Sequence, residues 1–174
     1  MKINRIILVT VMLMSGWIAS AQSQFDKFED IDGVTSVVVT QKAFALMSKI
    51  GSESDDEYME LIKNIESLRV FATESAEVGV QMQNAATGYL KSSNLEKLMT
   101  VKDGGSNVTI YVREGKSEDY VKELFMFVKD GDSSSRESVI ISLTGDIDLN
   151  QIAKLTEKMD LPGGEHLEKA SKNK

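Results

Sequence analysis

The chain has 174 residues, a formal net charge of −7 and no cysteine. The absence of cysteine excludes disulfides, thiolate metal sites and thiol nucleophiles, so stability must come from packing alone. Because an acidic domain repels phosphates and gains nothing from anionic lipids, we expect neither nucleic acid nor a membrane surface as a partner.

The N-terminus has the pattern of a secretory signal peptide. Lys2 and Arg5 precede an apolar run over residues 6–14, and Ala19-Ser20-Ala21 supplies small residues for cleavage. The run is about half of the roughly 20 residues needed to span a bilayer. We therefore expect cleavage after Ala21, with Gln22 as the new N-terminus. No cysteine follows that site, so we expect no lipid anchor and release as a soluble periplasmic or secreted protein.

The remaining 153 residues are the right size for one domain. Their formal charge becomes −9, because the leader takes two basic residues with it. Residues 22–33 form a polar lead-in that ends in an Asp-Gly turn signal. Residues 34–40 are rich in β-branched side chains and predict a strand. This strand lacks alternation, which indicates burial on both faces.

Helical and extended patterns then follow along the chain. A helix is predicted from Thr40 to Ile50, and a second one after Asp55, where Tyr58, Leu61, Ile62 and Ile65 share one face. A strand over 68–73, a helix over 75–91 and strands over 95–102, 108–112, 120–129 and 139–143 come next. The last helix begins at Asp148, with Gln151 completing a capping box, and ends at Pro162.

Consecutive strands late in the chain indicate an antiparallel sheet. We predict an α+β two-layer sandwich with helices on one face, formed by a single domain over residues 34–160. Residues 161–174 are predicted to be a flexible charged tail.

Few groups remain for catalysis. The single histidine, His166, lies in the predicted tail, where nothing would orient its ring, so histidine-dependent catalysis and His- or Cys-based zinc sites are disfavoured. Glu123 interrupts an otherwise apolar strand and can point inward, but we expect it to face solvent on an edge strand. No Walker or dinucleotide glycine pattern is present, so we expect no cofactor.

One stretch has the ligand spacing of a calcium loop. Asp146, Asp148 and Asn150 alternate, and Glu157 stands at the twelfth position. Gln151, however, occupies the sixth position, where the turn of such a loop needs glycine. The alternative is a strand end followed by a helix cap, which we favour over calcium.

Several segments resemble one family. Phe25-Asp26-Lys27-Phe28 and residues 33–40 resemble its opening, Leu98-Met99 with Val101-Lys102-Asp103 its middle, and residues 143–149 with Glu123-Leu124 its closing part. Over residues 25–160 the chain therefore resembles a family of exported bacterial proteins called domain of unknown function 4252. The resemblance implies an envelope location and no known reaction or catalytic residue.

These observations favour a non-enzymatic envelope protein that presents a sheet face or edge to another protein. The alternative is a small-molecule or cation binder that uses the acidic stretch near residue 148. An enzyme that uses only carboxylates would need Glu123 to face a second carboxylate in a cleft.

Overall fold

The computed structural model of the protein describes residues 23–50, 62–103, 106–130, 137–149 and 151. In chain order the elements are η1 (Ser23–Phe28), β1 (Thr35–Thr40), α2 (Gln41–Ile50), β2 (Ile65–Thr73), α4 (Ala76–Ser92), β3 (Glu96–Asp103), β4 (Ser106–Glu114), β5 (Tyr120–Asp130) and β6 (Ser138–Asp148). The predicted signal peptide, the Tyr58–Leu61 part of the second predicted helix, most of the last helix and the tail lie outside the described residues.

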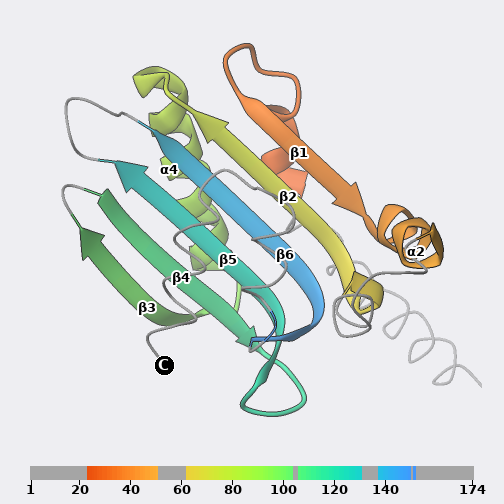
Figure 1. Ribbon diagram of the computed structural model, residues 1–174. Coiled ribbons are helices and arrows are strands. Elements are labelled where there is room, and N and C mark those ends of the chain that lie inside the picture. Colours follow the sequence, from red (N-terminus) through yellow and green to blue (C-terminus); the bar gives the residue numbers. More distant parts are fainter. Residues whose placement is uncertain (1–22, 51–61, 104–105, 131–136, 150, 152–174) are drawn as a thin grey trace, which may run out of the picture.

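One six-stranded antiparallel sheet organises these elements, in the order β1-β2-β6-β5-β4-β3 (Figure 1). Strands β3 and β4 form a hairpin, because their register places Asp103 opposite Ser106. The last strand is inserted between β2 and β5, so it joins two parts of the chain that are distant in sequence. The arrangement leaves β1 and β3 as the outer strands.

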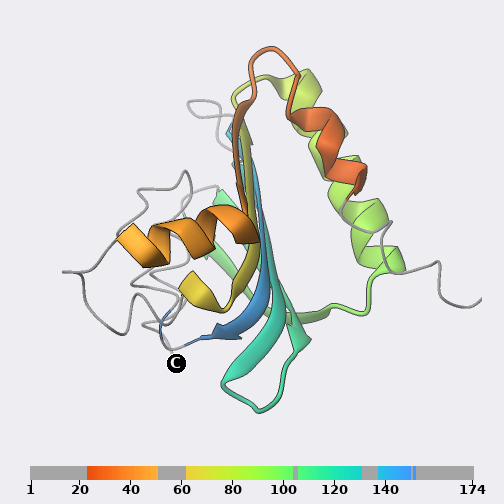
Figure 2. The ribbon, with the colours of Figure 1, turned by 90° about the vertical axis from the view of Figure 1, so that its right-hand side faces the viewer.

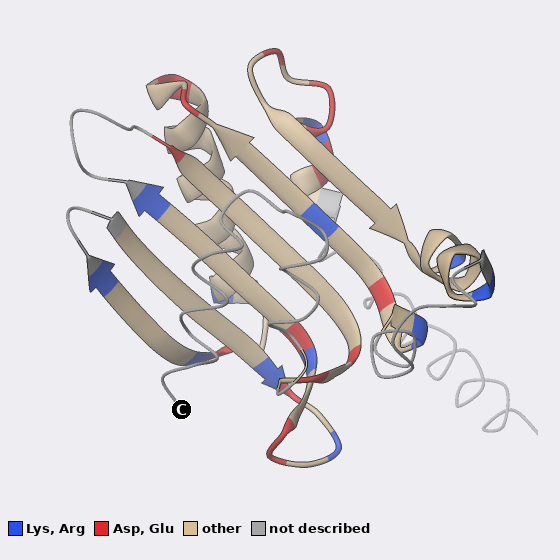
Figure 3. Cartoon of the chain, in the orientation of Figure 1, with Lys and Arg blue, Asp and Glu red and all other residues tan. Residues whose placement is uncertain are grey.

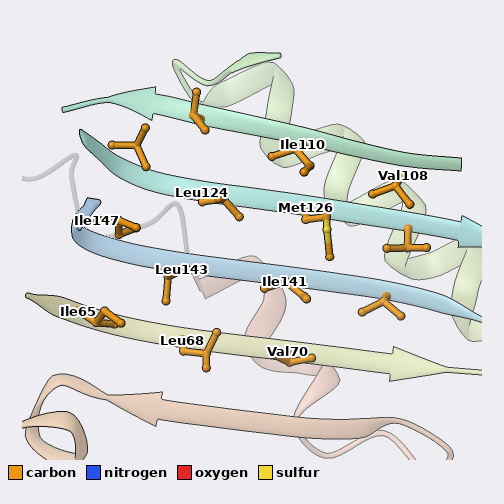
Figure 4. Close-up of a cluster of buried hydrophobic side chains, with 14 of the residues drawn as sticks. Ile65, Leu68, Val70, Val108, Ile110, Leu124, Met126, Ile141, Leu143 and Ile147 are labelled. Atoms are coloured by element: carbon orange, nitrogen blue, oxygen red, sulfur yellow. The ribbon is translucent and has the colours of Figure 1, made fainter. Parts of the chain in front are cut away.

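Helices pack on the sheet from two sides (Figure 2). Helices α4 and η1 cover one face, here called the α4 face, where the buried residues are Phe25, Phe28, Phe71, Met82, Ala86, Tyr89, Phe125 and Ile140. The opposite face carries aliphatic side chains from every strand between β2 and β4, including Leu68, Val70, Ile110, Leu124, Met126, Ile141 and Leu143 (Figure 4). Phe44 of α2 is fully buried in this second cluster.

The α+β class, with a helical layer on an antiparallel sheet, is confirmed. The early helix α2 does not join α4, because Phe44 packs on the opposite face. The helix predicted over 75–91 is observed over Ala76–Ser92, and the Ser75 hydroxyl caps it by accepting from the Val78 N–H at 3.4 Å. The double-sided apolar pattern of β5 is explained by its central position, which buries both of its faces.

Three boundaries or burial patterns differ from prediction. Ile65, expected on a helical face, begins β2 and is fully buried there. Strand β6 extends to Asp148, so this residue is a strand residue and not the start of a new helix. The prediction that β1 is buried on both faces is wrong, because Thr35, Val38 and Thr40 are exposed. Its β-branched composition indicates a strand but does not distinguish an outer from an inner one.

The irregular pairing of β2 with β6 depends on Gly145. Its φ is +143°, and a Cβ atom there would lie 2.2 Å from the carbonyl oxygen of Asn64. That carbonyl accepts the N–H of Asp146 at 2.9 Å, so the backbone cannot move away without losing a hydrogen bond. The site is therefore closed to any side chain.

We expect Gly145→Ala to lower the free energy of unfolding by about 2–4 kcal/mol, through strain and overpacking. Gly88→Ala is the matched control, because a Cβ at this exposed position of α4 would meet only the Gln24 side chain, at 3.8 Å. The control should stabilise the fold by about 0.5–1 kcal/mol. Urea unfolding measures both values, and a neutral Gly145→Ala would contradict this account.

Candidate functional site

Glu123 lies inside the protein, not on a solvent-exposed edge. Its strand, β5, pairs with β4 on one side and β6 on the other, and its side chain is only 5% exposed. The expectation that it faces solvent is therefore wrong. The apolar residues around Glu123 indicated this burial, but the sequence does not show which strands flank β5.

Two side chains meet the Glu123 carboxylate. The hydroxyl of Tyr89, from α4, donates to Oε1, and the Arg113 guanidinium, from β4, donates to Oε2 at 2.8 Å. Arg113 stands directly opposite Glu123 in the β4–β5 register. The Tyr89 ring also packs against Phe25 and Phe125, with centroids 5.2 Å apart in both pairs. The network thus joins α4, η1 and two strands.

Burial of the Tyr89 hydroxyl, and next its hydrogen bond to the Glu123 carboxylate, raise the tyrosine pKa far above its ordinary value. The hydrogen bond to Glu123 likewise raises the pKa of Arg113. Tyr89 is thereby held neutral, as a hydrogen-bond donor to a carboxylate whose two oxygens are both engaged. This arrangement fixes the position of α4 and does not supply the second carboxylate that an enzyme using only carboxylates would need beside Glu123.

Lysine side chains bind one of the carboxylates in the acidic stretch at the end of β6. Both carboxylate oxygens of Asp146 accept hydrogen bonds, from Lys116 at 2.9 Å and from Lys122 at 3.1 Å. Hydrogen bonds to these ammonium groups lower the pKa of Asp146. A calcium ion on Asp146 would have to displace both of them.

The other predicted calcium ligands are less informative. The Asp148 carboxylate accepts from the side-chain amide of Gln151 at 3.3 Å. Asn150 and Glu157 lie outside the described residues, as does His166, so the calcium site stays a prediction. Within the described ranges, no three His, Cys, Asp or Glu side chains are grouped as a metal site would need.

A groove of about 410 Å³ lies between the start of β3, the end of β4 and the start of β5, beside Leu149, which follows β6. Its apolar walls include Leu98, Val112 and Leu149, and its rim carries acidic and basic side chains together. The Lys116 ammonium lies 3.9 Å from the centroid of the Tyr120 ring at this rim. Because both charge signs are present, the groove does not select one ligand charge.

The two outer strands differ in how they are protected. Strand β3 carries four charged residues, Glu96, Lys97, Lys102 and Asp103, and its pairing is interrupted between Lys97 and Met99. Charges and bulges of this kind prevent an outer strand from pairing with other chains. Strand β3 is therefore a poor template for a further strand.

Strand β1 has none of these protections. Its sequence, Thr-Ser-Val-Val-Val-Thr, contains no charge and no proline, and it pairs with β2 without a register shift. Figure 3 shows the contrast, with charge colours on β3 and none on β1. Val38 is 37% exposed on this strand, opposite Arg69 of β2. The outer side of β1 is thus the best candidate binding site among the described residues.

The raised pKa of Tyr89 predicts how stability depends on pH. An unfolded tyrosine loses its proton at about pH 10, whereas the folded protein retains it. The stabilisation is fully present below that pH and is lost as the pH rises above it. We expect the free energy of unfolding to fall more steeply above about pH 10 in the wild type than in Tyr89→Phe.

Urea titrations at several pH values measure this difference. Tyr111→Phe, which removes a half-buried phenol from β4, is the matched control and should keep the wild-type slope. Equal slopes for the wild type and Tyr89→Phe would contradict the role given to Tyr89.

Comparison with known proteins confirms the resemblance noted in the sequence. The model of a family described as Domain of unknown function (DUF4252) matches residues 28–155. No curated protein and no solved structure matches the chain. The matched range contains every strand of the sheet, Glu123 with its two partners, and the outer strand β1. The chain belongs to the DUF4252 family.

Proposed function

We propose that this chain is an exported, non-enzymatic interaction domain of the cell envelope, which binds a partner by adding a strand to β1. The observation that carries the proposal is the unprotected outer side of β1, in contrast to the charged and bulged β3. Main-chain hydrogen bonds supply the affinity in strand addition, and neighbouring side chains supply the specificity.

The surroundings of β1 suit this role. Val37 and Val39 are only partly buried in the second cluster, so an added strand would cover apolar surface that is now accessible. On the other side of the strand Val38 is exposed, and Arg69 next to it is tied to Asp26 of η1 by an ion pair. Every residue of β1 also pairs with β2, so its backbone is already extended for strand addition, which limits the ordering cost of binding.

Export is the second part of the proposal and rests on the leader pattern that ends at Ala21. No helix among the described residues is long and apolar enough to cross a bilayer.

Binding of a small molecule in the groove near Tyr120 is the alternative function, because the volume of this groove, about 410 Å³, is within the range of ligand pockets.

Site-specific photo-crosslinking tests the role of β1. A photoreactive residue at Ser36 should give a crosslinked product in envelope fractions, and one at Thr100 on β3 should not. Val38→Glu should abolish the product, because its carboxylate would have to be desolvated on strand addition. Thr100→Glu is the matched control and should leave the product unchanged. Equal crosslinking from both edges, or none from Ser36, would overturn the proposal.

Export has its own test. We expect the full chain, expressed in a Gram-negative host, to be recovered from the periplasm or medium with Gln22 as its first residue. Intact-mass spectrometry identifies this N-terminus. Replacing Ala19 and Ala21 with arginine should block processing and retain the longer chain. Recovery of the unprocessed wild type from the cytoplasm would refute this part of the proposal.

A further inference from the structure

We infer that the strand added to β1 comes from a second copy of this chain, so that two sheets join edge to edge about a two-fold axis. The inference rests on the proposed function of β1 and names its partner. It is carried by the pairing that β1 can make with itself and by the charges at its two ends.

Strand β1 is complementary to itself in an antiparallel pair. A two-fold axis perpendicular to the sheet keeps the same face of both copies on the same side, so each residue meets one that points the same way. With Val37 on the axis, Ser36 meets Val38 of the second copy, and Thr35 meets Val39. Each pair consists of uncharged β-branched or small side chains, and such pairs favour the association of neighbouring strands.

Charges at the two ends of β1 favour the same antiparallel arrangement. The chain before the strand carries the acidic residues Asp30 and Asp32, and the chain after it carries exposed Lys42 in the first turn of α2. Figure 3 shows acidic colour before β1 and basic colour in α2. An antiparallel pair places the acidic end of each copy beside the basic end of the other, twice. A parallel pair would instead place like charges together.

The surface of the joined sheets also supports a second copy as the partner. Val37 and Val39 project to the face of the sheet opposite the α4 face, where they border the buried aliphatic cluster. In the two-fold pair these valines of both copies lie side by side across the junction. The accessible part of each valine is then covered by the other molecule.

Strand β3 does not offer an equivalent contact. Pairing two copies through β3 would bring Lys97 and Lys102 of each copy into the new junction, where their ammonium groups would lose water. The interruption of pairing at Leu98 would also break the ladder of main-chain hydrogen bonds. The self-association we infer is therefore specific to β1.

Sedimentation of the processed protein over a range of concentrations tests this inference. We expect a dimer at about 100 µM, which weakens at least tenfold in Val38→Glu and is unchanged in Thr100→Glu. Circular dichroism and urea unfolding verify that both variants are folded. In the Val38→Glu monomer the new carboxylate would face Arg69, so we expect the fold to tolerate the substitution. A protein that stays monomeric at every concentration overturns the inference.

Charge exchange tests the antiparallel geometry without changing the strand. Asp32→Lys and Lys42→Asp alone should each weaken the dimer about fivefold, since each replaces two attractive contacts with repulsive ones. The double variant should restore the wild-type dimer. If it weakens the dimer as much as both single variants together, the two-fold arrangement is wrong.

The crosslinking experiment separates this inference from the proposed function. A Ser36 product with twice the mass of the chain supports the second copy as the partner. A Ser36 product of another mass, together with a monomer in sedimentation, supports strand addition by a different protein and overturns the dimer. Absence of any Ser36 product overturns both.

Discussion

Strand β6 holds the domain together because it is buried on both faces and paired on both sides. Val139, Ile141 and Leu143 enter the second cluster, and Ile140 enters the α4 face. Its neighbours are β2 and β5, which are separated in the sequence by α4, β3 and β4. Without β6 the sheet would divide into a two-stranded and a three-stranded piece, and an isolated two-stranded piece is marginally stable at best in water. The helices, the buried network and the two outer strands all depend on this insertion.

Local patterns in the sequence predict most elements but not their arrangement in the sheet. The apolar stripe of α4 and the alternation of β4 are local signals, and the elements they predict are observed. The position of β6 between β2 and β5 depends on contacts between distant residues, which periodicity does not encode. For the same reason the pattern places Ile65 on a helix, because its spacing from Ile62 suits a helical face, yet pairing with β6 draws it into a strand.

The candidate site shows the same limit. Glu123 stands out in the sequence because it is charged among apolar neighbours, and that signal does identify a buried group. Its partners could not be predicted, because Tyr89 comes from a helix 34 residues earlier and Arg113 from the neighbouring strand. The outer position of β1 could not be predicted either, because valine-rich strands occur both inside and at the edges of sheets. Only the short length of β1 and the Thr residues at its two ends indicate an outer position.

The charges and the bulge of β3 have a further consequence for assembly. A sheet with two receptive edges can add molecules head to tail, β1 on β3, and nothing in that geometry ends the growth of a fibre. In the association proposed above, only β1 would accept a strand, because the other edge carries Glu96, Lys97, Lys102 and Asp103. Edge-to-edge association through β1 would therefore end after a single junction. Because the other outer strand, β1, is uncharged, the charges of β3 would limit the proposed association to a defined complex and oppose aggregation.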